Sequence, residues 1–406
     1  MGMLGCLMTL LAWPSGSQAA DSEALINLLI KKGIITQAEL TQASKELAST
    51  QNPSSKPKVA AEDSGTIEDR VAKLESSLTD KTTMHVGKGT LKMGGLFQTW
   101  AVYDARTANG RDRFQIRRAE LKFAGDILGD DRFKYTIVVD PSQVQEDNTT
   151  RSSLKDAYFL LDHLPYLPNH TLTVGEFKAP RTEEGTRSSG QLDFAERSIV
   201  TKTFGDQRDL GAMLTGNWPI TTYQLGVFNG KQNQAPKHDQ KSLAGRLVIR
   251  PLKLAESAME LPNLGDLELG ISGEYRPHGD IVLPKKRLGY EARYAYQNLS
   301  LKGEYYTGED TTSASSTTEN NSVGKGWYSQ VGYLLAPWFP KAQVLARFEG
   351  WDPNDNTALD AERDLTLGVN YFIDKHNAKW QLNWVHQTKQ TGKVDNQVIS
   401  ALQYAF

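Results

Sequence analysis

The chain ends on Val398-Ile-Ser-Ala-Leu-Gln-Tyr-Ala-Phe406, a stretch in which two kinds of side chain alternate. Every second residue from Val398 onward is apolar, apart from the small Ser400, and the last residue is aromatic. Successive side chains of a β-strand point to opposite faces, so residues i and i+2 share a face. The stretch therefore predicts a terminal β-strand with one apolar face.

The same period of two runs through the chain from about residue 90. Leu288, Tyr290 and Ala292, for example, alternate with Gly289, Glu291 and Arg293. One alternating strand suits any antiparallel sheet, whereas repetition over 300 residues is far more specific. About sixteen strands are predicted, near 91–104, 113–126, 132–140, 154–163, 170–178, 208–217, 222–229, 241–250, 266–276, 286–296, 299–307, 326–335, 342–351, 363–373, 378–387 and 397–406.

The polarity of the chain is compatible with membrane insertion only through strands. After the first residues, no stretch approaches the ~18 consecutive apolar residues of a spanning helix, and the mean hydropathy is −0.49. In a transmembrane barrel only alternate residues face lipid, so the average stays low. The terminal Tyr-x-Phe also resembles the C-terminal signal of bacterial outer-membrane barrels. We therefore predict an all-β transmembrane barrel over residues 84–406.

Connection lengths support this topology. Polar stretches such as 105–112, 179–207 and 308–325 are predicted to be external loops, and they alternate with short turns such as 297–298. An even number of strands with this alternation places both termini in the periplasm. The 251–265 connection is too long for a tight turn and fits the scheme least well.

The first 80 residues are predicted to be separate from the barrel. Residues 1–19 resemble a signal peptide, which would remove the only cysteine, Cys6. Lipidation at that cysteine is the less favoured alternative. Residues 20–48 are predicted to form short helices, and 49–65 a linker rich in Ser, Pro and Lys.

Residues 66–80 carry the spacing of a short coiled coil. Ile67, Val71, Leu74 and Leu78 follow the a/d positions of about two heptads. Two heptads are marginal alone, and a lone amphipathic helix is the alternative. A trimeric barrel would raise the local concentration of this segment and favour a periplasmic coiled coil.

The polar strand faces predict a water-filled lumen. An Arg or Lys facing mid-bilayer lipid costs about 2–4 kcal/mol, whereas in a wet lumen it stays hydrated. Net charge is −2, so no nucleic-acid partner is expected. Cross-strand ion pairs remain the alternative explanation for each charge taken singly. The predicted basic residues of the lumen are Arg118, Lys122, Lys134, Lys178, Arg246, Arg276, Arg293 and Arg347.

The long connection 179–207 is the predicted constriction. Its length implies a function, and arginines beside hydroxyl groups suit oxyanions through charge-assisted hydrogen bonds. A loop that covers a subunit interface is the alternative. The candidate anion-binding residues are Arg187, Ser188, Ser189, Arg197 and Lys202.

Several motifs make a resemblance specific. The runs that carry it are Phe114-Gln-Ile-Arg-Arg-Ala-Glu-Leu-Lys122, Phe133-Lys-Tyr-Thr136, Leu154-Lys-Asp-Ala-Tyr158, Val174-Gly-Glu-Phe-Lys178, Ser188-Ser-x-x-Leu-Asp-Phe-x-Glu-Arg197, Arg208-Asp-Leu-Gly211 and Gly226-Val-Phe-Asn-Gly230. Over about 90–230 the chain resembles the phosphate-selective porin O and P family. The remaining barrel matches that family in pattern only.

The resemblance implies a sixteen-stranded homotrimeric porin of the outer membrane whose third loop folds inward, with Arg187, Ser188 and Ser189 matching the positions that bind phosphate. The expected partners are small anions, outer-membrane lipid and lipopolysaccharide. Acidic residues interleave with the basic ones, which departs from a strict arginine ladder and leaves a weakly selective general porin open. A structural tether that contacts peptidoglycan is a further alternative. No G-x-S-x-G or H-x-x-x-H spacing occurs, so an enzyme, a cofactor or a metal site is not expected.

Overall fold

The computed structural model describes residues 83–105, 112–144, 153–205, 208–230, 241–259, 263–277, 285–310, 323–336 and 338–406. The chain divides into two units, 1–75 and 76–406, and every described residue belongs to the second. The predicted signal peptide, the short helices, the linker and the coiled coil all lie outside the described residues.

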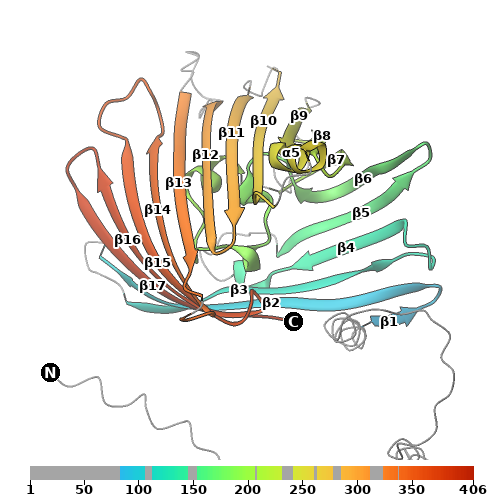
Figure 1. Ribbon diagram of the computed structural model, residues 1–406, viewed down its shortest axis with the longest axis horizontal. Helices are drawn as coiled ribbons and strands as arrows, with labels where there is room; N and C mark the ends of the chain where they lie inside the picture. Colours follow the sequence, from blue (N-terminus) through green and yellow to red (C-terminus); the bar gives the residue numbers. More distant parts are fainter. Residues whose placement is uncertain are drawn as a thin grey trace, which may run out of the picture. The chain divides into compact units, whose positions relative to one another are not determined.

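The described part is a closed antiparallel β-barrel (Figure 1). Its elements are β1 (Thr83–Val86), β2 (Gly89–Asp104), β3 (Arg113–Asp126), β4 (Phe133–Val139), η2 (Pro141–Val144), β5 (Leu154–Leu164), β6 (Leu167–Lys178), α4 (Glu183–Thr186), η3 (Ser189–Gln191), η4 (Thr201–Gly205), β7 (Arg208–Asn217), β8 (Thr221–Phe228), β9 (Ser242–Ile249), α5 (Pro251–Met259), β10 (Asp266–Arg276), β11 (Lys285–Tyr296), β12 (Leu299–Asp310), β13 (Val323–Leu334), β14 (Ala342–Asp352), β15 (Glu362–Asp374), β16 (Ala378–Lys389) and β17 (Val394–Ala405).

Sixteen strands, β2 to β17, form the barrel, and each pairs with its neighbours in sequence. Pairing of β17 with β2 closes it, with Ser400 opposite Ala101. The short β1 only forms a hairpin with the start of β2. The predicted barrel of about sixteen strands is thus confirmed, and no predicted strand end differs from the structure by more than three residues.

Long and short connections alternate around the barrel. The rim where β2 begins and β17 ends, here called the terminal rim, carries short turns such as 165–166 and 297–298. The opposite rim, the loop rim, carries the long connections. The 250–265 connection is long because it contains α5. No helix in the described part of the chain is long and apolar enough to span a membrane.

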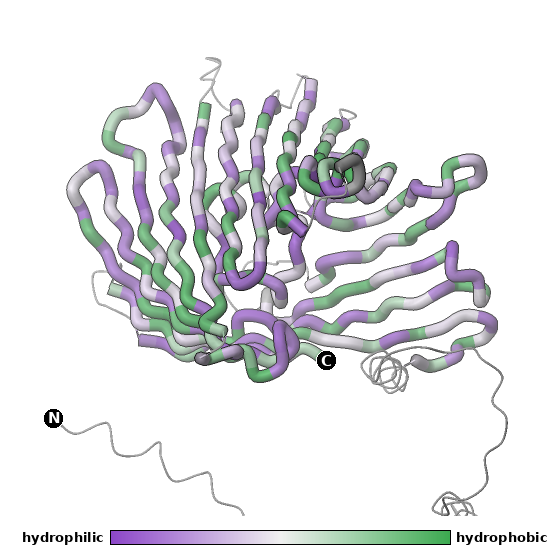
Figure 2. The backbone as a smooth tube through the Cα atoms, viewed as in Figure 1, coloured by the Kyte–Doolittle hydropathy of each residue, from purple (hydrophilic) through white to green (hydrophobic). Residues whose placement is uncertain are grey.

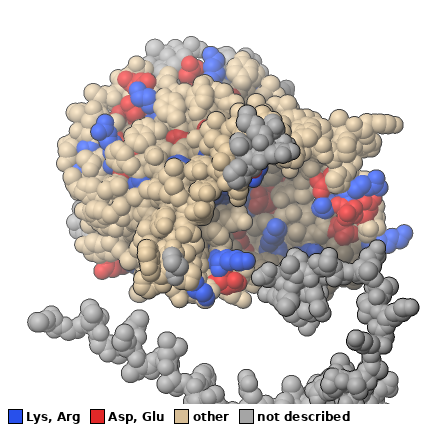
Figure 3. All heavy atoms as spheres, viewed as in Figure 1, with Lys and Arg blue, Asp and Glu red and all other residues tan. Residues whose placement is uncertain are grey.

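Hydrophilic and hydrophobic residues alternate along the strands (Figure 2), and this alternation gives the barrel an apolar outer face and a polar inner face. In β17, Leu402 and Tyr404 are 52% and 57% exposed, whereas Gln403 is 3% exposed and faces inward. On the face shown in Figure 3, charged side chains gather at the edges of the wall and in the hollow. Trp100 is an aromatic residue of the inner face, because it is buried against Ala195 inside the barrel.

Candidate functional site

The described part of the connection between β6 and β7, residues 179–205 and here called the inward loop, lies inside the barrel. It contains α4, η3 and the single-turn π-helix η4. The Thr182 hydroxyl accepts a hydrogen bond from Gly185 N at 2.9 Å, which caps α4. Phe194 and Val200 of the loop are almost fully buried. The loop is therefore packed into the lumen, as its length and the family resemblance predicted.

Contacts with the wall opposite β6 hold the inward loop in place. The Glu304 carboxylate on β12 accepts hydrogen bonds from the backbone N–H groups of Glu183 and Glu184, each at 2.9 Å. Ala195 N donates to Asn383 Oδ1 of β16 at 2.8 Å. Further wall groups in contact with the loop are Gln98 on β2, Arg117 on β3, Glu274 on β10, Arg287 on β11, Arg347 on β14, Lys379 on β16 and Gln403 on β17.

Two buried charge clusters strengthen this attachment. Asp193 forms an ion pair with Lys302 and accepts from Gln330 Nε2 at 2.7 Å. Burial by itself raises the pKa of Asp193, but the Lys302 ammonium, the Arg187 charge and the hydrogen bond from Gln330 together hold that pKa below its ordinary value. Arg347 lies 4.8 Å from the ring of Phe194 and donates to Glu196 O at 3.1 Å. The inward loop is thus held at several independent points.

The structure separates the predicted loop residues into two roles. Arg197 is 2% exposed, and its guanidinium donates to Arg187 O at 3.0 Å and to Ser189 Oγ at 3.4 Å. It therefore holds the loop together from within. Ser188 Oγ accepts from Gly190 N at 3.3 Å, and both Ser188 and Ser189 line a cavity.

The other two predicted loop residues lie at different places. Arg187 donates from Nε to Glu183 Oε1 at 2.5 Å, so a carboxylate neutralises part of its charge. Lys202 lies in η4 with its side chain exposed, and the described residues include no hydrogen bond or ion pair to its ammonium. The five residues therefore do not converge on one ligand.

Most predicted basic residues of the lumen wall have partners. Lys134 pairs with Asp162 at 2.6 Å, Arg246 with Glu291 at 2.5 Å, Arg293 with Asp266 at 2.9 Å and Arg347 with Glu349 at 3.2 Å. Arg118 Nη1 donates to Gln98 Oε1 at 2.6 Å, and Arg276 Nη1 to Gly230 O at 2.9 Å. The cross-strand ion pairs considered from the sequence are thus widespread.

Lys122 and Lys178 both lie beside the inward loop. The Lys178 ammonium donates to two backbone oxygens of the inward loop, Gly185 O at 2.7 Å and Arg187 O at 2.5 Å. For Lys122, the described part of the chain offers no hydrogen-bond or ion-pair partner. Both side chains line the same cavity. The positive charge of Lys122 is therefore less neutralised than those of the paired arginines.

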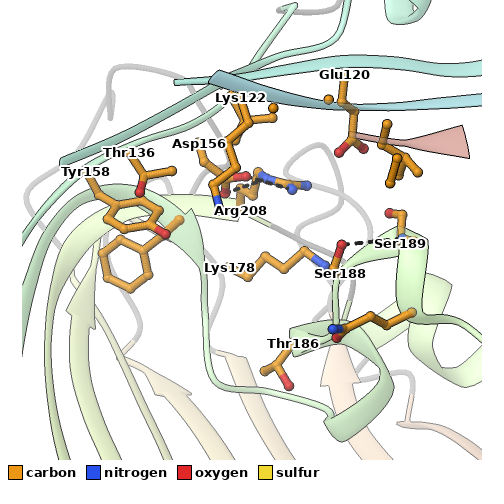
Figure 4. Close-up of a pocket in the computed structure, with 18 of the residues that line it drawn as sticks. Glu120, Lys122, Thr136, Asp156, Tyr158, Lys178, Thr186, Ser188, Ser189 and Arg208 are labelled. Atoms are coloured by element: carbon orange, nitrogen blue, oxygen red, sulfur yellow. Dashed lines mark hydrogen bonds and ion pairs between the residues drawn. The ribbon is translucent and has the colours of Figure 1, made fainter. Parts of the chain in front are cut away.

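That cavity, here called the lumen cavity, has a volume of about 550 Å³ and lies between the inward loop and strands β2 to β8. Figure 4 shows Lys122, Asp156 and Arg208 on the strand side and Thr186, Ser188 and Ser189 on the loop side, with Lys178 between them. Its charged lining is Lys122, Lys178, Arg208, Glu120 and Asp156. Three of these side chains are basic and two are acidic, and hydroxyl groups, amides and the His376 imidazole complete the polar lining.

Two arginines of this region were missed by sequence reasoning. A β-bulge between β2 and β3 pairs Gln98 with Arg118 but Thr99 with Ile116, so Arg117 is the extra residue. Strict alternation would place Arg117 toward lipid, whereas it contacts Glu196 of the inward loop at 3.2 Å. Nothing in the sequence marks this bulge.

Arg208, the second of the two, donates to Asp156 at 2.9 and 3.0 Å. Asp156 and Arg208 both lie near the loop-rim ends of their strands. This shared position could have indicated from the sequence that the two side chains pair.

The family model for phosphate-selective porin O and P matches residues 92–262 and 271–406. The chain belongs to the phosphate-selective porin O and P family. The family and the closed barrel together make this protein an outer-membrane porin channel. The described residues include no cluster of His, Cys, Asp and Glu placed to hold a metal ion.

Solved porins share the fold at low sequence identity. The anion-selective porin from Comamonas acidovorans is 12% identical with a TM-score of 0.55, covering 78% of this chain and 100% of that one. The outer-membrane channel DcaP of Acinetobacter baumannii is 12% identical with a TM-score of 0.57, covering 79% and 99%. The trimer form of OmpT from Vibrio cholerae is 11% identical with a TM-score of 0.51, covering 78% and 99%.

One curated relative of this porin is an uncharacterised protein of Aquifex aeolicus. It is 23% identical over 270 residues, which make up 59% of this chain. The match spans 65% of the length of that relative, slightly less than two thirds.

Proposed function

We propose that this porin forms a water-filled channel for the passive diffusion of small anions, phosphate among them. The observation that carries this proposal is the lumen cavity, which Lys122, Lys178 and Arg208 line together with two acidic and six hydroxyl-bearing side chains. Lysine and arginine donors attract an anion, and hydroxyl donors replace part of its hydration. No bond is made or broken, so the wall works by attraction and by size alone.

The ion pairs of the wall limit the strength of this preference. Arg246, Arg293 and Arg347 each lie beside a carboxylate, so an ion that passes them meets nearly cancelled charges. The net attraction then depends on a few residues at the lumen cavity. This pattern supports a modest anion preference, and it is the observation that favours a weakly selective general porin as the second candidate.

Assembly and orientation form part of the same proposal. We place the terminal rim in the periplasm, because it carries the short turns, whereas the long connections of the opposite rim suit external loops. A homotrimer in outer-membrane lipid and lipopolysaccharide is proposed by analogy with the OmpT trimer form, which has the same fold. Trimerisation would also favour the predicted periplasmic coiled coil and a contact with peptidoglycan.

The decisive measurement is the reversal potential of the purified full-length protein in a planar bilayer under a KCl gradient. An anion-selective potential, followed by a reduced current when millimolar phosphate is added, is the expected result. A potential near zero without block by phosphate would favour the general porin. Cation selectivity would overturn the anion proposal, and absence of conductance would favour the structural tether.

A further inference from the structure

The lumen cavity has an apolar wall as well as a polar one. Tyr158 and Leu160 of β5, Phe177 of β6 and Met213 of β7 contribute to its lining. Tyr158 and Leu160 are half-buried, whereas Phe177 and Met213 are almost fully covered. Tyr158 and Leu160 therefore present the accessible apolar surface, and Phe177 and Met213 support it.

Aromatic packing fixes the position of this apolar wall. The ring of Tyr158 meets Phe177 edge to face, with centroids 6.0 Å apart. Phe177 in turn packs edge to face on Phe228 at 5.6 Å, within a buried cluster that includes Met213. Such pairs are favourable geometries for aromatic rings. The Tyr158 ring is thus held in place before any solute arrives.

The distance between the polar and apolar walls is about the length of a small organic molecule. Lys122 is paired with Val138, Val138 with Asp156, and Thr136 with Tyr158. Tyr158 therefore lies two strands and two residues away from Lys122, about 12 Å between backbones at ordinary strand spacing. The flexible lysine chain covers part of that distance. Figure 4 shows Lys122 and Tyr158 in the same cavity, on the strand side.

A bare inorganic anion would use only half of this lining. It would bind the cations and hydroxyls but leave the Tyr158 and Leu160 surface in contact with water. An anion with an apolar body removes that surface from water, which is favourable in proportion to the area covered. The cavity volume of about 550 Å³ lies in the range typical of sites for small organic ligands.

We propose that the lumen cavity prefers aromatic carboxylates to small anions of the same charge. The carboxylate lies at Lys122 and the loop hydroxyls, and the ring lies on Tyr158 and Leu160. This proposal rests on the anion channel proposed above and names its solute class. Weak binding at such a site slows a solute enough to block smaller ions while still allowing it to leave.

The test compares benzoate with acetate, because both are monoanionic carboxylates and only benzoate carries a ring. Each is added to full-length protein in a planar bilayer, and the reduction in KCl current is titrated. Half-block by benzoate at a concentration at least fivefold lower than by acetate is expected. Equal block by the two anions would overturn the proposal. An anion-selective reversal potential in the same experiment would then leave the proposed function standing.

Two variants locate the effect. Tyr158→Ser removes the ring and is expected to bring the benzoate and acetate values together, whereas Tyr158→Phe keeps the ring and the difference. Tyr333→Ser, on the outer wall where Tyr333 is 40% exposed, is the matched control and should change nothing. Persistence of the benzoate preference in Tyr158→Ser would refute the assigned site. Cation selectivity of the unmodified protein would refute both the channel proposal and this one.

Discussion

Lys122→Gln removes one positive charge from the lumen cavity while nearly preserving side-chain length. A sphere of the cavity's volume has a radius of about 5 Å, so an ion at its centre lies about 6 Å from a wall charge. Two unit charges at that distance in water interact by about 0.7 kcal/mol. Screening at 0.1 M salt, where the Debye length is about 10 Å, reduces this to about 0.4 kcal/mol.

The substitution acts on both ions of the salt. An anion loses about 0.4 kcal/mol of stabilisation and a cation is relieved of an equal repulsion, so their permeability ratio falls by about fourfold. The assay is the reversal potential in a KCl gradient centred near 0.1 M. At 1 M salt the Debye length is about 3 Å, and the same variant should change the ratio by less than about twofold.

Lys341→Gln is the matched control, since it makes the same charge change in an exposed turn at the terminal rim. It should leave the permeability ratio close to that of the unmodified protein. A change below about 1.5-fold for Lys122→Gln at 0.1 M salt, or an equal change for Lys341→Gln, would refute the assignment of Lys122 to the selective part of the channel.

Three further outcomes are expected. Arg187→Glu should weaken anion preference, because it replaces a cation and adds repulsion to Glu183, and an unchanged reversal potential would remove Arg187 from the site. Asp193→Asn breaks a buried ion pair with Lys302, and loss of one partner of such a pair typically destabilises by about 3–5 kcal/mol. The single-channel current should become noisier because the inward loop is held less firmly, while gels still show the folded barrel. A current as quiet as that of the unmodified protein would contradict this. His376 is half-buried in a turn beside the Lys379 ammonium, and this burial and the nearby charge lower its pKa to about 4. Since the folded protein binds this proton less tightly than the unfolded chain, acidification below about pH 6.5 should favour unfolding, and an NMR titration midpoint above 6 would refute this.

The strands were predictable because their information is local. Alternation along Leu288–Tyr296 identifies a strand, and the two-residue connection 297–298 fixes its pairing with the next one. Every barrel strand pairs with its sequence neighbours, apart from the closure of β17 on β2. The sequence therefore sufficed to predict the number, order and approximate ends of the strands.

The candidate site was only partly predictable. The inward position of 179–207 followed from its length and from the resemblance, and Lys122 and Lys178 followed from alternation. Alternation did not predict that Lys134 pairs with Asp162, nor that Arg197 is buried and holds the loop together. Which charges remain available to a solute depends on partners that alternation alone does not specify.

By itself, the sequence determined a transmembrane barrel with a polar lumen, because the alternation of apolar and polar residues is a pattern among neighbouring residues. Only the tertiary structure decided where charge is left uncancelled. Ala195 and Asn383, 188 residues apart, meet across the lumen, and the bulge at Arg117 turns one more arginine inward. Such contacts depend on how the closed wall and the inward loop fit together in three dimensions, and no local pattern records that fit.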